Sequence, residues 1–483
     1  SRESILRTPS ISRSITDITK MVPQASKDNS FGGANFRYNN VTIDGAINND
    51  AIGFSPSAGG ISGTGGMMGS STRTNPISMD AIEDVQVYLA PYDVKIGNFT
   101  GGSINAVTRS GTNTVTGSVY AFGRNANFVG KENAGDKSKI PSSFHEYQTG
   151  IRVGFPIVKD KVFFFTNFEI TDRVDPVTQG AASPDAARVI DAAEAKTIRD
   201  FLINNYKYDP GTFGNFDTYS RSQKFFNRLD WNLDDHNQLT VRNNLVFSKS
   251  TNLERDELEF RFSGISYEQV NNQNATVAEL KSRFGGALSN SLLVGYSAVH
   301  DYRDPLSNPA FPQVQLQGKT PGTTIYFGTD REASIFDMRQ RTTEITDNLT
   351  WYHGKHTFLF GTHNELYNIQ YGFVNAWNGR VDYQDNPASG ETALETLLAG
   401  EPARVRGAYN FVNNSRESIM ANPSAQFHIN FYSLYAQDEI QVSRRFRFTG
   451  GLRMDYTDVP KKQTISYRMQ HADTDPVPDS SLS

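Results

Sequence analysis

Two patterns of apolar and polar residues divide the chain near residue 112. Before that point, apolar residues come in short groups separated by glycine-rich segments. After it, apolar and polar residues alternate through most segments up to about residue 460. Because the side chains of a strand point alternately to opposite faces, a period of two predicts a long series of half-buried β-strands. We therefore expect a small N-terminal domain, residues 1–112, and a β-domain, residues 113–483.

The N-terminal segment carries the signals of a small α/β unit. Apolar residues recur at helical spacing over 15–22, and a proline follows at once. The segments 41–43 and 85–89 read as short strands, the first closed by an Asp-Gly turn. The stretch GGSINAVTRSG, 101–111, supplies a last β-like segment. These elements predict a compact mixed domain.

The strands that follow are unusually long. In YQTGIRVGF, residues 147–155, Tyr147 and Ile151 share one face and Arg152 lies on the other. The same alternation recurs in QLTVRNNLVF, 238–247, and in RFRFTGGLRMDY, 445–456. Globular strands usually have about five or six residues, whereas about 9 to 11 residues cross a bilayer at a tilt. Several of these strands are longer than that, which makes them long enough to span a membrane.

The connections between strands alternate in length. Short turns are expected near 158–161, 234–237, 289–291, 353–356 and 443–445, and long, polar, irregular segments over 175–220, 253–272, 305–338 and 374–423. Short turns on one side and long loops on the other are typical of an outer-membrane barrel. One long loop contains a helical pattern over 183–206, which we expect to pack on its own loop rather than recognise a partner.

Composition narrows the class of protein. The net charge is −5 and the pI is near 6.0, which argues against a nucleic-acid partner. There is no cysteine, so disulfides and thiolate metal sites are absent. No run approaches the roughly 18 apolar residues of a transmembrane helix. A transmembrane barrel remains compatible with the mean hydropathy of −0.51, because half of each barrel strand is polar.

The strand count predicts an incomplete barrel. About 11 strands are expected, the last over 445–460. A single-chain bacterial barrel has an even number of strands, and an open edge cannot lie in lipid. We therefore expect this sequence to contain a plug and about half of a larger barrel.

Several segments, in their order, resemble TonB-dependent outer-membrane receptors, in particular the Oar-like branch of Bacteroidota. They include RYNNVTIDGAINND, AIEDVQVYLAPYDVKIGNFTGGSINAVTRSGTN, GFPIVKDKVFFFTNFE and LYAQDEIQVSRRFRFTGGLRMDY. The resemblance implies a membrane all-β, antiparallel barrel of about 22 strands, filled by an N-terminal α/β plug. It places the protein in the bacterial outer membrane, in contact with its lipid, with the plug toward the periplasm and the long loops outside. It also implies import driven by a periplasmic TonB-type protein.

The resemblance gives the glycine-rich loop 45–76 a place at the outward apex of the plug. A loop this long without periodicity is usually functional or mobile. Its side chains either face a substrate or belong to a loop that binds nothing. The substrate-binding candidates are Asn48, Asn49, Asp50, Phe54, Met67 and Met68. Aromatic residues of a later loop, such as Tyr371, Phe373, Trp377 and Tyr383, either stack on a ligand or pack the loop on itself.

Charged residues on the polar face of the barrel strands are expected to face the lumen. We expect them to satisfy the polar surface of the plug rather than bind substrate directly. Polar contacts would also let the plug move at small cost, because water replaces a lost hydrogen bond. These residues are Arg152, Arg228, Asp230, Arg242, Arg447, Arg453 and Asp455.

No constellation of catalytic residues is visible. His353 and His356 flank a short turn without a third metal ligand, and GISGTGG lacks the Lys-Ser/Thr ending of a phosphate loop. We therefore expect neither an enzyme nor a metal or other cofactor. Two functions remain. The first is active import through a plugged barrel, with a surface lipoprotein lid as a further partner. The second is a docking subunit of an outer-membrane assembly for secretion, protein insertion or adhesion.

Overall fold

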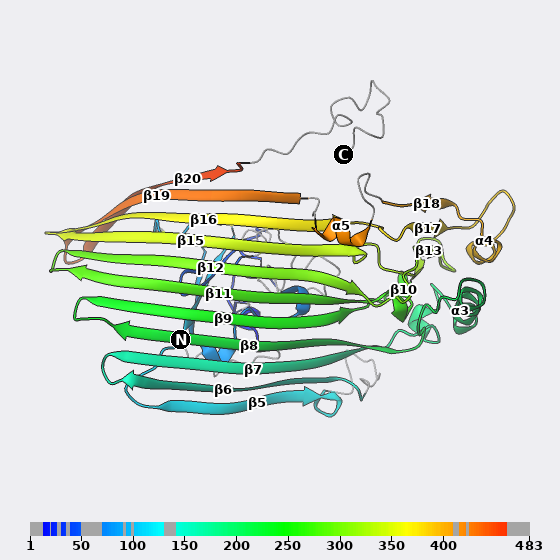
Figure 1. Ribbon diagram of the computed structural model, residues 1–483, viewed down its shortest axis with the longest axis horizontal. Coiled ribbons are helices and arrows are strands. Elements are labelled where there is room, and N and C mark those ends of the chain that lie inside the picture. Colours follow the sequence, from blue (N-terminus) through cyan, green and yellow to red (C-terminus); the bar gives the residue numbers. More distant parts are fainter. Residues whose placement is uncertain are drawn as a thin grey trace, which may run out of the picture.

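The structure is a computed structural model. It describes residues 13–19, 21–26, 30–34, 39–49, 70–89, 93–97, 101–129, 142–408, 415–421 and 425–460. These residues form three β-sheets of 11, five and four strands (Figure 1). The largest sheet is a membrane-type wall, the smallest belongs to the plug, and the third lies at the long-loop end.

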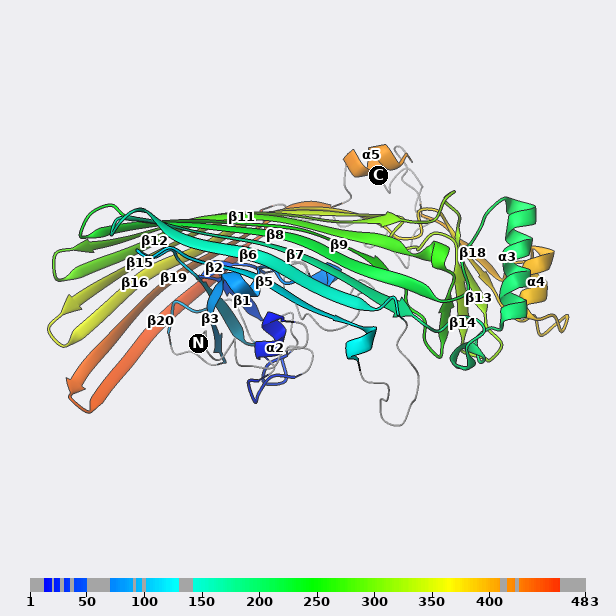
Figure 2. The ribbon, with the colours of Figure 1, turned by 90° about the horizontal axis from the view of Figure 1, so that it is seen from below.

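The 11-stranded sheet is a meander in which each strand pairs antiparallel with its neighbours in order. Its strands are β5 (Thr116–Asn125), β6 (His145–Val158), β7 (Val162–Val177), β8 (Phe216–Asn232), β9 (Asn237–Asn252), β11 (Tyr267–Phe284), β12 (Leu288–Pro305), β15 (Ile335–His353), β16 (His356–Val374), β19 (Ala425–Ser443) and β20 (Phe446–Asp458). The predicted number of strands is thus confirmed. The sheet is curved like the wall of a barrel but is not closed (Figure 2).

The alternation of apolar and polar residues gives the two faces of the wall different surfaces. On β20 the outward residues Leu452 and Met454 are 83% and 64% exposed, as expected of a surface that meets lipid. On β8 the inward residues Ser220, Ser222 and Lys224 are buried because the plug covers them. The two-residue period therefore places the apolar residues outside and the polar residues inside. None of the described helices is long and apolar enough to cross a bilayer.

The plug lies in the concave face of the wall (Figure 2). It comprises α2 (Ile15–Thr19), β1 (Asn40–Ile43), β2 (Ala46–Ile47), η2 (Ser70–Thr72), η3 (Met79–Ala81), β3 (Ile82–Tyr88) and β4 (Ser103–Thr108). Its sheet has the order β2-β1-β4-β3, with β1 and β4 parallel. The helix ends at Thr19, short of the predicted residue 22. The proline at position 23 disfavours helical backbone at residue 22, which agrees with a helix that does not reach that residue.

The long loops are not irregular, and that prediction was wrong. They contain η5 (Pro184–Ala186), α3 (Ala192–Tyr206), β10 (Glu259–Arg261), η6 (Ser263–Ile265), β13 (Gln313–Gln317), β14 (Thr324–Phe327), β17 (Arg380–Tyr383), α4 (Ala393–Ala399), β18 (Arg404–Arg406) and α5 (Arg416–Ala421). The strands pair in the order β10-β14-β13-β17-β18. We call the folded unit made by loop residues 178–215, 253–266, 306–334 and 375–408 the loop cap. Its strands are short, and the pairs β10–β14 and β13–β17 join different loops, so no local period reveals the sheet.

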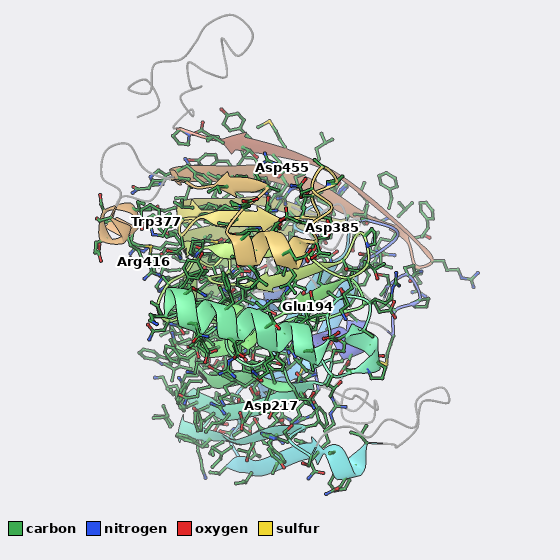
Figure 3. The ribbon with its side chains drawn as sticks, turned by 90° about the vertical axis from the view of Figure 1, so that its right-hand side faces the viewer. Glu194, Asp217, Trp377, Asp385, Arg416 and Asp455 are labelled. Carbon is green, nitrogen blue, oxygen red and sulfur yellow. The ribbon has the colours of Figure 1, made fainter. Side chains whose placement is uncertain are left out.

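The loop cap has an apolar core of its own. The helix α3 begins at the N-cap Asp191, whose side chain accepts a hydrogen bond from Glu194 N at 2.9 Å. Ile198 and Leu202 of this helix are buried with Phe327 and other residues from the strands of the cap. The helices α3 and α4 lie side by side across this end of the molecule (Figure 3). The helix therefore packs on several loops, not only on its own.

Candidate functional site: the contact between plug and wall

The turn between β1 and β2 of the plug is held by charged residues of the wall. Asp44 adopts a left-handed backbone conformation (φ 47°) that aspartate tolerates in tight turns. Its carboxylate accepts hydrogen bonds from Thr108 N at 2.7 Å and Thr108 Oγ1 at 2.5 Å. It also forms ion pairs with Arg242 at 3.1 Å and Arg228 at 3.6 Å. The plug's turn and its last strand are therefore fixed to β8 and β9 at one point.

Asp230 organises this contact from the wall side. It accepts hydrogen bonds from the Arg228 guanidinium at 2.8 Å and from Thr240 Oγ1 at 2.8 Å. Arg228 also donates to Thr108 Oγ1 at 2.9 Å. Three predicted lumen residues, Arg228, Asp230 and Arg242, thus come together. Their plug partner Asp44 was read from the sequence only as a turn residue.

A second contact lies around a buried ion pair that sequence reasoning missed. Lys224 Nζ lies 3.0 Å from Glu169 Oε1, and the two side chains are 3% and 0% exposed. Ser78 Oγ of the plug donates to Glu169 Oε2 at 2.6 Å, and Tyr120 OH donates to the same oxygen at 3.1 Å. The sequence did contain a signal for this contact. Lys224 is an even number of residues from Arg228 on the same strand, so both side chains face the lumen.

The plug segment 70–80 follows the wall toward the long-loop end. Thr72 Oγ1 lies 2.7 Å from Ser248 Oγ, and Asn244 Nδ2 donates to Pro76 O at 2.7 Å. Arg73 forms an ion pair with Asp175 at 3.0 Å. These contacts are polar and come from side chains that point into the lumen.

Arg152 lies near the plug but beyond hydrogen-bonding distance of it. Its Nε is 3.9 Å from Asp80 Oδ1, whereas Arg13 of the plug reaches Asp80 Oδ2 at 2.9 Å. Burial raises the pKa of Asp80 above its ordinary value, and the positive charge of Arg13 opposes that rise.

Arg453 is the plug contact on the last strand. It donates to Val94 O at 2.9 Å and to Ser433 Oγ at 2.7 Å, and Asp455 holds its Nε at 2.8 Å. Arg447, predicted with this group, is 61% exposed and pairs with Glu439 of the neighbouring strand at 3.2 Å. Its position toward the short-turn end of β20 keeps it away from the described plug residues.

Two apolar contacts interrupt this polar interface. Phe165 and Phe226 of the wall join the plug's core, with ring centroids 6.2 Å apart. Ala46 of the plug packs on Val277 and Leu293. The described interface between plug and wall is therefore made mainly by polar side chains, with apolar packing at these two places.

The predicted substrate-binding residues are only partly described. Asn48 is 3% exposed, and Asn49 bonds within the plug through Val41 N at 2.7 Å and Asn40 Oδ1 at 3.0 Å. Asp50, Phe54, Met67 and Met68 lie outside the described residues. A substrate-binding role for these six residues stays a prediction.

The predicted loop aromatics differ in their surroundings. Tyr383 belongs to the apolar core of the cap, and Phe336 contacts both Tyr371 and Phe373 edge-on. Trp377 lies on the long-loop side (Figure 3). Among the described residues, no three His, Asp or Glu side chains gather as metal ligands, and His356 bonds Asp438 at 2.8 Å.

Comparisons with known proteins agree with this architecture. The family model described as "Outer membrane beta barrel domain" matches residues 107–215 and 188–476. The TonB-dependent transporter Oar of Myxococcus xanthus is 28% identical over 237 residues, which are 47% of this chain and 20% of Oar.

Two solved structures share the fold at low identity. The outer-membrane transporter YddB from Escherichia coli is 15% identical with a TM-score of 0.61, over 95% of this chain and 56% of YddB. The siderophore receptor PirA from Acinetobacter baumannii is 15% identical with a TM-score of 0.55, over 95% of this chain and 56% of PirA. The chain thus spans about half the length of these solved structures. It belongs to the outer-membrane β-barrel family, has the plugged fold of TonB-dependent receptors, and is an outer-membrane protein.

Proposed function

We propose that this chain forms the plug and part of the barrel of an active importer. A substrate binds at the long-loop face, and a periplasmic TonB-type protein then displaces the plug to open a path along the wall. The observation that carries the proposal is the plug's attachment to the lumen wall by side-chain hydrogen bonds and ion pairs. Asp44, Ser78, Thr72 and Val94 each make such a contact with a different part of the wall.

This attachment suits a plug that moves. A hydrogen bond inside a protein contributes only about 0.5–1.5 kcal/mol net, because water satisfies the same groups once they separate. A dry apolar interface of similar size would lose its contacts without replacement. The two apolar contacts, at Phe165 with Phe226 and at Ala46, are small beside the polar set. We infer that these two places resist displacement most strongly.

The proposal includes an organisation of the whole protein. Residues 1–112 form the plug on the periplasmic side, and residues 113–483 form barrel strands with extracellular loops. The described plug sheet ends at Thr108 and the wall begins at Thr116, which supports a boundary between them. A surface lipoprotein that covers the loop face is a further proposed partner.

A reversible lock on the plug tests the proposal. The chain has no cysteine, so Thr72→Cys with Ser248→Cys introduces a single possible disulfide, between plug and wall. We expect oxidation to stop TonB-dependent uptake and a reductant to restore it. The control is Thr171→Cys with Ser222→Cys, which joins β7 to β8 at a 2.6 Å hydroxyl contact and leaves the plug free. Uptake that survives the plug lock, or that is unchanged without TonB, would contradict the proposal.

The same experiment separates import from docking. A docking subunit would keep its partners and its activity with the plug locked, since nothing has to pass through the lumen. The relatives and solved structures reported above are transporters and a receptor, which favours import. Co-purification of a stoichiometric assembly that works with the locked plug would favour docking.

A further inference from the structure

A group of polar side chains lies on the outward face of β15, β16 and β19, three neighbouring strands of the wall (Figure 1). Gln340 of β15 faces the plug, where its Nε2 donates to Asn49 O at 3.5 Å. The residues on either side of it therefore point outward. We call the outward group the donor patch. The strand register puts Arg341, Asn368 and His428 in one row of it and Arg339, Gln370 and Gln426 in the next.

The donor patch has the size of a small polar head group. Neighbouring strands lie about 4.8 Å apart, and residues two positions apart on a strand lie about 7 Å apart. Three strands and two rows therefore cover about 10 Å by 7 Å. One molecule with several oxygen atoms can contact all of it at once.

The patch offers hydrogen-bond donors and positive charge without a carboxylate. Each of its six side chains carries at least one N–H group. Arg341 and His428 are exposed, and neither bonds another described residue. The nearest carboxylate in the register, Asp337, accepts from Arg339 at 3.2 Å and from His300 at 2.8 Å. The guanidinium of Arg341 is therefore available to an anion from outside the chain.

Outward cations elsewhere on the wall are neutralised by the wall itself. Arg221 of β8 bonds Asp172 of β7 at 2.8 Å, and Lys249 of β9 bonds Glu268 of β11 at 3.1 Å. Each of these cations has its carboxylate on the neighbouring strand. The excess of positive charge at Arg341 is thus a local property of the donor patch.

The height of the patch places it at the outer edge of the bilayer. Trp351 and Phe358 lie outward near the short turn, with ring centroids 5.3 Å apart, as expected of the aromatic girdle at the inner edge. Arg341 precedes Trp351 by ten positions on β15. This is roughly 33 Å along the strand and roughly 25 Å of height at a tilt of about 40°. The apolar band of an outer-membrane barrel is about 25 Å tall, so the patch lies beside the outer head groups.

We propose that the donor patch binds the phosphate-bearing sugar head group of a lipid in the outer leaflet. The guanidinium of Arg341 can donate two parallel hydrogen bonds to a phosphate, and the amides of the patch can bond the hydroxyl groups of the sugar. The occupant is a lipid because the outward face below the patch is apolar at Leu349 and Ile345, which are 37% and 39% exposed and offer contact to acyl chains. The proposal does not depend on what the protein transports.

A matched pair of lipids tests this inference. Lipid A is an acylated disaccharide with two phosphate groups, and its dephosphorylated form keeps the sugar and the chains. We expect native mass spectrometry of the full-length protein in detergent to show tighter binding of lipid A, by a factor of about five for one arginine at an anionic lipid surface. Equal binding of the two lipids, or binding of neither, would overturn the proposal.

A single substitution locates the site. Arg341→Gln removes the charge and keeps an N–H donor, and it should weaken lipid A about five-fold without changing the dephosphorylated form. The matched control is Arg221→Gln, an equally outward arginine whose charge Asp172 already neutralises, and it should leave binding unchanged. Heat-modified gel mobility checks that both variants fold. The same loss in both variants, or no loss at Arg341, would reject the donor patch.

A competition experiment distinguishes a lipid from a free phosphate. Excess inorganic phosphate should not displace lipid A, because it has no acyl chains that hold it at this height of the wall. Displacement of lipid A by inorganic phosphate alone would assign the patch to a soluble anion and contradict the lipid.

Discussion

The plug and the loop cap are two small units attached to the same wall by different means. The cap is built around an apolar core that includes Ile198, Phe262 and Phe327, each fully buried. The plug has its own core but meets the wall mainly through carboxylates, guanidinium groups and hydroxyls, such as Asp44 and Ser78. The first arrangement resists separation, because exposing apolar surface has no compensation in water. The second permits separation, because each polar group can exchange its partner for water.

This contrast shows that the two small units attached to the wall differ in how firmly they are held. The apolar core fixes the geometry of the cap, because its side chains pack together from all four loops. The polar contact between plug and wall can open without unfolding of either unit, as the proposed import step requires.

The largest effect is expected from opening the cap's core. Phe327→Ala removes a fully buried ring that packs at 6.0 Å on Phe262. We expect a loss of about 3–5 kcal/mol in the free energy of opening the cap, measured by hydrogen exchange in β13 and β17. The control is Val405→Ala, at a 67% exposed position of the same sheet. It should change the free energy of opening the cap by less than about 0.5 kcal/mol. Equal exchange changes in the wall would show that the cap is no separate unit.

An effect of similar size is expected where the plug interface is most deeply buried. Lys224→Met leaves Glu169 charged without its cation and should cost about 3–5 kcal/mol in the free energy of unfolding, measured in urea. Adding Glu169→Gln should recover much of that loss, since the unpaired charge is gone. The control is Lys249→Met in the neighbouring strand, whose pair with Glu268 is partly exposed and worth about 1 kcal/mol or less. A single substitution at Lys224 without effect would mean that this contact is hydrated.

A smaller effect is expected at the plug's turn. Asp44→Asn keeps the left-handed backbone but removes the charge that faces Arg228 and Arg242. We expect the free energy of opening of the plug to fall by about 1–3 kcal/mol, measured by hydrogen exchange in β1 and β4. Asp93→Asn is the matched control, because that plug carboxylate pairs with Lys95 at an exposed position. Unchanged exchange at β1 after Asp44→Asn would show that this ion-pair group does not hold the plug.

The smallest effect is expected on the surface of the cap. A hydrogen bond from Lys319 holds the pKa of Asp191 below its ordinary value. The contribution to stability is therefore present above the unfolded pKa of about 3.9 and is lost as the pH falls through the lower folded pKa. Asp191→Asn keeps an N-cap residue for α3 and should cost at most about 1 kcal/mol at pH 7. The difference in stability between the variant and the parent should shrink as the pH falls through the folded pKa of Asp191, and thermal unfolding at pH 7 and at acid pH measures it.

Much of the wall could be predicted from local patterns. The period of two separated Ile151 from Arg152 and Phe448 from Arg447, because strand geometry alone decides which face a residue occupies. The same parity placed Arg228, Asp230 and Arg242 in the lumen. Their partners could not be predicted, since Asp44 lies almost 200 positions before Arg242, and nothing local indicates which polar groups meet across a lumen.

By itself the sequence determined the strands of the wall, their number, the inward charges and the short mixed unit before them. These properties follow from alternation, turn residues and length, which act between neighbours in the chain. Only the tertiary structure decided that four polar loops share one apolar core and that Lys224 pairs with Glu169. Such contacts join residues far apart in sequence, and their energies arise from burial that exists only once the chain has folded.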